Sequence, residues 1–140
     1  MRKVAVGTDG SKNAGAALRW AAEYARGHGA TLKVIHVWSY PYPTSEAMEY
    51  AAFTPDSFEE AAMATLNAAL AEVDTTGLVV EKVTREGHEA TELLDAASDA
   101  DVLVVGARGH GGFAGLLLGS VASQCTRHPK IPTVVIPTAA

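Results

Sequence analysis

The stretch from Val104 to Ala122 reads VVGARGHGGFAGLLLGSVA and carries six glycines, most of them ahead of a triple leucine. It follows a strand-like apolar run and leads into a segment with helical spacing. Glycine loses more conformational freedom on folding than any other residue. Such a cluster therefore indicates a backbone shape, or a close approach to the backbone, that a Cβ atom would prevent.

Outward from this stretch, strand-like and helix-like segments alternate along the chain. Apolar, mostly β-branched runs predict strands at Lys3–Thr8, Leu32–Trp38, Leu78–Thr84, Val102–Val105 and Ile131–Ile136. Helices are predicted from Ser11 to the stop signals Gly27 and Gly29, from Pro55 (capped by Thr54) to Val73, after Gly87, and from the glycine stretch to about Arg127. Between the second strand and the second helix, residues 39–56 are expected to form a long surface loop. This βαβαβαβαβ order predicts a single-domain α/β fold, an open five-stranded parallel sheet with helices on both faces.

The composition narrows the class of protein. Of the 140 residues, 48% are hydrophobic and 19% are charged, as in ordinary soluble domains, and the net charge is -5 at pH 7. This acidic balance argues against broad binding to nucleic acid or to an anionic membrane surface, so neither is an expected partner. Cys125 is the single cysteine, and no apolar run is as long as a signal peptide or a membrane span. Together these features predict a cytoplasmic location.

Two loops carry the candidate chemistry. GTDGS, residues 7–11, leaves the first predicted strand, and GARGHGG, residues 106–112, leaves the fourth. Ligands of open α/β sheets bind beyond the carboxyl ends of the strands, where the winding direction reverses. If these two strands are neighbours, both loops border one crevice. Glycine amides beside a helix N-terminus attract anions, which predicts an anion site in that crevice.

The glycine spacing resembles that of a known family. Gly106-x-x-Gly109, followed after nine residues by Gly119-Ser120, is similar to the nucleotide-binding signature of ATP-binding universal stress proteins. The resemblance covers essentially the whole chain and includes residues 8–11, His36-Val37 and residues 132–135. It implies a Rossmann-like fold of the adenine nucleotide alpha hydrolase-like type, a stress-response role, and ATP, with or without Mg²⁺, as the ligand.

The resemblance also implies a role for each matching position. Asp9 and its turn would lie against the adenosine, and the backbone of Val37 would meet the adenine edge. Gly106 and Gly109 would let the ribose and phosphates approach. The implied binding set is Gly7, Thr8, Asp9, Val37, Val105, Gly106, Arg108, Gly109, Gly119, Ser120 and Val121, of which the last three would hold the phosphates. Arg108 and His110 are the cationic candidates in the loop itself.

Other interpretations of the same residues stay open. The glycines could simply connect a strand tightly to a helix, with Ser120 as an ordinary N-cap and Asp9 as a turn residue. No nucleophile–base pair, metal-ligand spacing or G-x-x-x-x-G-K-[ST] motif occurs, so no catalytic or metal-binding residues are predicted. The main interpretation is an ATP-binding regulatory module whose surface an unidentified protein partner reads. A slow Mg²⁺-dependent ATP hydrolase and a nucleotide-independent interaction protein are the alternatives.

The last predicted strand suggests an assembly. By resemblance it lies at an edge of the sheet, and residues 133–136 (TVVI) form an apolar edge that invites pairing. We therefore expect a two-fold homodimer in which Thr133 to Ile136 pairs antiparallel with its copy, because such a contact closes on itself. The alternative is a monomer whose edge is blunted by Pro132 and Pro137.

Overall fold

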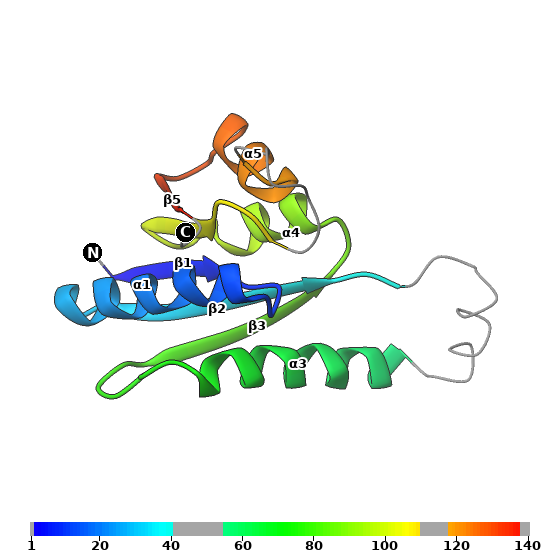
Figure 1. Cartoon of the computed structure of the whole chain (residues 1–140), viewed down its shortest axis with the longest axis horizontal. Helices are drawn as coiled ribbons and strands as arrows, with labels where there is room; N and C mark the ends of the chain where they lie inside the picture. The colour runs from blue at the N-terminus through cyan, green and yellow to red at the C-terminus, as the bar shows by residue number, and fades with distance from the viewer. Residues whose placement is uncertain (1, 41–54, 110–117, 138–140) are drawn as a thin grey trace.

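Five parallel strands form one sheet in the order β3-β2-β1-β4-β5 (Figure 1). The structure is a computed structural model and describes residues 2–40, 55–109 and 118–137. The strands are β1 (Lys3–Gly7), β2 (Thr31–Trp38), β3 (Val80–Glu86), β4 (Val102–Gly106) and β5 (Thr133–Ile136). The helices in these ranges are α1 (Lys12–His28), α3 (Pro55–Ala71), α4 (Glu89–Ala96) and α5 (Ser120–Arg127). The predicted α/β class and open parallel sheet are confirmed.

Helices cover both faces of this sheet, as the alternating pattern predicts. On one face, Leu18 of α1 and Leu66 of α3 are buried against valines of β1, β2 and β4. On the other, Leu93 of α4 and Cys125 of α5 are buried with Ile35 of β2. The four apolar residues 102–105 of β4 are each at most 5% exposed. Burial on both faces explains why β4 reads as an uninterrupted apolar run.

The ends of α1 follow its capping residues. Ser11 is the N-cap, and its hydroxyl accepts a hydrogen bond from the Ala14 amide at 3.2 Å. Gly29 is the C-cap, with a φ of 63° in the left-handed region that favours glycine. The helix therefore ends at Gly29, whereas Gly27, the other expected stop signal, lies inside it.

Four predicted boundaries are wrong by about two residues. The strand β3 begins at Val80 rather than Leu78 and ends at Glu86 rather than Thr84, because its pairing with β2 runs from Leu32↔Val80 to Trp38↔Glu86. The helix α3 ends at Ala71, since the Val73 amide bonds three residues back, to Leu70, instead of four. The strand β5 begins at Thr133, after Pro132, which has no amide hydrogen to donate. The expected cap Thr54 and residues 41–54 of the expected loop lie outside the described residues.

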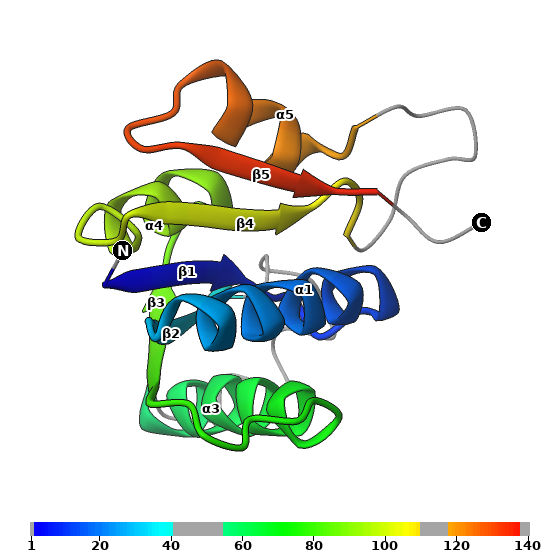
Figure 2. The same cartoon turned by 90° about the vertical axis from the view of Figure 1, so that its left-hand side faces the viewer.

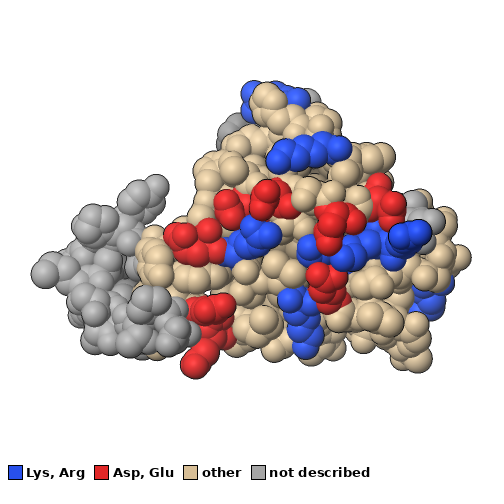
Figure 3. Space-filling model, turned by 180° about the vertical axis from the view of Figure 1, so that it is seen from behind, with Lys and Arg blue, Asp and Glu red and all other residues tan. Residues whose placement is uncertain are grey.

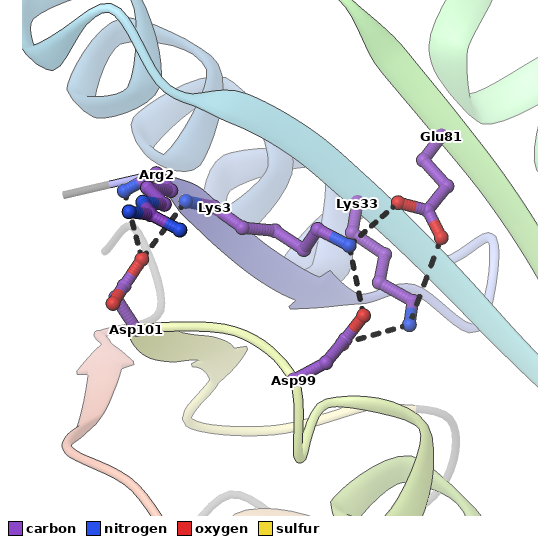
Figure 4. A network of polar contacts seen from close by, with 6 residues as sticks. All are labelled: Arg2, Lys3, Lys33, Glu81, Asp99 and Asp101. Carbon is purple, nitrogen blue, oxygen red and sulfur yellow. Dashed lines mark hydrogen bonds and ion pairs between the residues drawn. The ribbon is translucent and has the colours of Figure 1, made fainter.

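A cluster of charged side chains joins three strands at the amino-terminal edge of the sheet (Figure 4). Lys33 Nζ lies 2.9 Å from Asp99 and 3.8 Å from Glu81, and its side chain is only 8% exposed. Lys3 Nζ lies 2.8 Å from Asp99 and 2.9 Å from Glu81. Because both lysines donate to Asp99, its pKa is lowered to about 2. The two carboxylates thus keep a buried lysine paired, as a buried charge requires.

The surface charges are mixed in sign. On the face drawn in Figure 3, Lys and Arg side chains lie beside Asp and Glu side chains across the middle of the molecule. Neither sign gathers into one large patch on that face.

The strand β5 is the outermost strand beside β4 (Figure 2). The carbonyls of Pro132 and Ile136 accept hydrogen bonds from amides on the β4 side, at 2.9 and 2.8 Å. Residues whose backbone groups face the neighbour alternate along a parallel strand. Thr133 and Val135 therefore turn their backbone groups toward the open edge, which confirms that β5 is an edge strand.

Candidate functional site

The two candidate loops meet because β1 and β4 are neighbours. The register pairs Val4 with Val102 and Val6 with Val104. Since the strands are parallel, their carboxyl ends lie at the same edge, with β2 on the other side of β1. The expectation that both loops border one crevice is confirmed.

The turn after β1 is built by its own side chains. The Gly10 amide donates to Thr8 Oγ1 at 3.2 Å, and the Ser11 amide donates to Asp9 Oδ1 at 2.9 Å. Gly10 has a φ of 82°, which an L side chain rarely adopts. Asp9 is thus a turn residue, and the N-cap of α1 is Ser11. These bonds fix the direction of the backbone as it leaves the sheet.

The loop after β4 packs tightly against the protein's own backbone. A Cβ on Gly106 would lie 3.2 Å from the carbonyl oxygen of Asn13 and 3.3 Å from that of Arg108. A Cβ on Gly119 would lie 3.3 Å from Arg108 Cα, and the Gly119 amide donates to Ala107 O at 2.6 Å. Close approach of the loop to α1 and to the start of α5 therefore accounts for glycine at both positions.

The helix α5 begins beside this loop. Its N-cap is Gly119, with φ −69° and ψ 168°, and a glycine has no side chain with which to cap the helix. The interpretation of Ser120 as N-cap is wrong, because Ser120 is the first helical residue. The Ser123 amide makes the first bond of the helix, to Gly119 O at 2.9 Å. The amides of Ser120, Val121 and Ala122 precede that bond, and helix geometry gives them no partner within the helix.

A pocket of about 390 Å³ lies between these elements. All eleven residues of the predicted binding set line it. They come from β1 and its turn (Gly7, Thr8 and Asp9), from β2 (Val37), from β4 and its loop (Val105, Gly106, Arg108 and Gly109), and from the start of α5 (Gly119, Ser120 and Val121). The structure thus brings the whole set together around one hollow at the carboxyl edge of the sheet.

The pocket is also lined by five residues that the predicted binding set does not contain. They are Ala14, Ile35, Glu89, Leu93 and Ala122. Ile35 lies two residues before Val37 on β2 and therefore on the same face of the sheet. Ala122 belongs to the first turn of α5, as Ser120 and Val121 do. Both residues could therefore have been predicted from members of the binding set. Glu89 and Leu93 follow β3, whose carboxyl end lies at the same edge of the sheet. His110, the second cationic candidate in the loop after β4, lies outside the described residues.

The pocket has charged groups of both signs. Asp9 and Glu89 contribute carboxylates, and Arg108 contributes a guanidinium group. The first turn of α5 adds a partial positive charge of roughly half a unit. Further along α5, burial and the charge of Glu89 raise the pKa of the Cys125 thiol to about 11, so this cysteine is a core residue rather than a nucleophile.

Comparisons with solved structures support this fold assignment. The structure of the hypothetical protein MJ0577 matches with a TM-score of 0.81 at 20% identity, over 99% of this chain and 97% of that one. A crystal structure of a universal stress protein in complex with cAMP matches with a TM-score of 0.63 at 28% identity, over 99% and 98% of the two chains.

The sequence comparisons give the same family. A universal stress protein of Mycolicibacterium smegmatis is 33% identical over 138 residues, which are 95% of this chain and 47% of that protein. The chain thus spans about half the length of the curated relatives it matches. The model of the universal stress protein family matches residues 1–137. The chain therefore belongs to the universal stress protein family.

Proposed function

We propose that this chain binds an adenine nucleotide in the pocket between the turn after β1 and the start of α5. The observation that carries the proposal is the position of the first turn of α5, whose residues line a pocket that is also lined by glycines. Such a helix start favours phosphate through both its donors and its dipole. The relative that is 28% identical and forms a complex with cAMP supports the same ligand class.

The geometry suggests how the ligand lies. The phosphates point to Gly119, Ser120 and Val121, where the Ser120 hydroxyl adds a side-chain donor. The carboxylate of Asp9 would repel phosphate, so it faces the ribose hydroxyls or the base. The backbone of Val37, near the end of β2, meets the adenine edge.

We propose ATP as the ligand and regulation rather than turnover as the outcome. The sequence has no G-x-x-x-x-G-K-[ST] motif, so it lacks the lysine that holds the β and γ phosphates in P-loop proteins. Among the described residues, no group of three or more His, Cys, Asp or Glu side chains is placed to hold a metal ion. In this proposal Mg²⁺, where it takes part, arrives bound to the phosphates. Bound nucleotide would order the loops and change a surface that a partner protein reads.

One preparation of purified protein tests this proposal. Nucleotide is extracted and identified, ATP and cAMP are titrated by calorimetry, and phosphate release is followed with MgATP. Bound adenine nucleotide with negligible turnover is expected. Steady phosphate release would favour the slow hydrolase, and absence of binding would leave an interaction protein that keeps only the fold.

The proposal includes a cytoplasmic location and a homodimer. None of the helices in the described ranges is long and apolar enough to cross a bilayer; cell fractionation tests the location itself. The dimer would form by antiparallel pairing of β5 with its copy, through the outward backbone groups of Thr133 and Val135. Sedimentation at micromolar protein concentration measures whether the protein has the mass of a dimer or of a monomer.

A further inference from the structure

The side chain of His36 continues the hydrogen bonding between β1 and β2 past the end of the paired strands. The last paired residues of the two strands are Gly7 and Ile35, and the Thr8 amide still donates to Ile35 O at 2.9 Å. The next carbonyl, that of Thr8, lies 2.8 Å from Nδ1 of His36. A carbonyl oxygen only accepts, so Nδ1 carries the hydrogen and donates it.

The bond holds the residue from which the pocket turn starts. Thr8 is 6% exposed, and its hydroxyl accepts from the Gly10 amide. The next residue, Asp9, accepts from the Ser11 amide and also lines the pocket. His36 does not itself line the pocket. An effect of this hydrogen bond on a ligand therefore passes from His36 through Thr8 to the Asp9 turn.

The same turn touches the loop after β4. A Cβ on Gly109 would overlap the carboxylate of Asp9, so the position of the turn and the position of that loop depend on each other. A shift of the Thr8 carbonyl would move Asp9 relative to both the pocket and Gly109.

We propose that His36 is a positioning residue for the nucleotide site: its Nδ1–H fixes the Thr8 carbonyl and thereby pre-orders the turn that carries Asp9. This inference rests on the proposed nucleotide binding. Without the bond, the turn must be ordered when the ligand binds, and the free-energy cost of that ordering weakens affinity. Loss of one net hydrogen bond corresponds to a change of up to about tenfold in Kd.

Two substitutions separate the hydrogen bond from the packing of the ring. His36→Leu removes the donor, whereas His36→Asn keeps an amide donor close to the position of Nδ1. His28 provides a matched control, because its Nδ1 makes the same kind of bond, to Tyr24 O at 2.8 Å, at the far end of α1. The wild type and the three variants are titrated with ATP and with cAMP, and each apo protein is melted.

We expect His36→Leu to weaken binding of whichever nucleotide the wild type binds by roughly fivefold to tenfold. His36→Asn should restore affinity to within about twofold of wild type, and His28→Leu should leave it unchanged. Amide hydrogen exchange of the apo protein gives a second readout, with faster exchange at Gly10 and Ser11 in His36→Leu but not in His28→Leu.

The outcomes distinguish this inference from the function on which it rests. A wild type that binds neither nucleotide overturns the proposed function, and the positioning role with it. A wild type that binds, with a folded His36→Leu variant of equal affinity and equal exchange at the turn, overturns the positioning role alone. Equal loss in His36→Asn and His36→Leu would also overturn it, because the donor would then not be the cause.

Discussion

The carboxylate of Asp9 lies against Gly109 so closely that a Cβ atom at position 109 would overlap Oδ2. The other oxygen, Oδ1, accepts a hydrogen bond from the Ser11 amide at 2.9 Å. One side chain thus links the turn after β1 to the loop after β4, and both segments line the pocket.

Gly109→Ala should displace this carboxylate. The obstructing atom is the end of a side chain, so the protein can yield at a cost of about 1 kcal/mol or less in unfolding free energy. We expect the apo melting temperature to fall slightly and ATP affinity to fall severalfold, because Asp9 can no longer keep its place. Calorimetry and melting curves measure the two effects separately.

A double-mutant cycle checks the cause. In an Asp9→Ala background the carboxylate is gone, so Gly109→Ala should cost less stability than it does in wild type. A coupling energy of at least about 0.5 kcal/mol is expected for residues in contact. Strict additivity would show that the contact between Asp9 and Gly109 does not control the loop.

The charged cluster at the opposite edge of the sheet makes acid stability depend on Asp99. The folded-state pKa of this carboxyl, about 2, lies below its usual value because Lys3 and Lys33 donate to it. Its contribution is therefore complete above about pH 4 and is lost as the pH falls toward about 2. Since the side chain is 52% exposed, solvent screening limits that contribution to about 1 kcal/mol.

Asp99→Asn should therefore flatten the dependence of stability on pH between about 4 and 2. Asp95→Asn is a matched control, because Asp95 pairs with exposed Arg85 instead of a buried lysine. Chemical denaturation at several pH values measures the free energy of unfolding of both variants. If the free energy of unfolding of folded Asp99→Asn protein still fell with acid as steeply as that of wild type, Asp99 would not be the source of the acid sensitivity.

The proposed dimer can be tested at the backbone of β5. Val135→Pro removes an amide that points to the open edge, whereas Val134→Pro removes one that pairs with β4. We expect Val135→Pro to give a folded monomer and Val134→Pro to destabilise the fold itself. Sedimentation measures whether each variant is a monomer or a dimer. A Val135→Pro protein that stays dimeric would exclude pairing through this strand.

Much of the fold could be predicted because its signals are local. The apolar run 102–105 marked a strand buried on both faces, and Ser11 marked the start of α1. The boundaries that were wrong depend on distant partners. β3 extends to Glu86 because β2 extends to Trp38, a pairing between residues far apart in the sequence.

In the candidate site, too, local motifs could be predicted from the sequence, whereas contacts between distant segments could not. Motif spacing found the residues on the loops after β1 and β4, but Glu89 enters the pocket only through the packing of α4 beside β2. The glycine spacing predicts backbone that makes room for phosphate. Gly106 also makes room for the Asn13 carbonyl at 3.2 Å, a contact between segments far apart in the sequence. Gly119→Val would crowd Arg108 in the same way, so it does not test phosphate contact cleanly.

Ser120→Asp tests phosphate binding at α5 most directly. A carboxylate at the first turn of a helix is favourable by about 0.3–1 kcal/mol, so the apo protein should stay folded with an equal or higher melting temperature. The same charge would repel phosphate. Ser120→Asn is the neutral control of similar size, and adenosine is the ligand that lacks phosphate.

The decisive measurement is the Kd of Ser120→Asp for ATP and for adenosine, compared with wild type and Ser120→Asn. We expect ATP affinity to fall at least tenfold, about 1.4 kcal/mol, while adenosine affinity stays within about twofold. Wild-type affinity for ATP in folded Ser120→Asp protein would contradict the proposal that the start of α5 holds the phosphates.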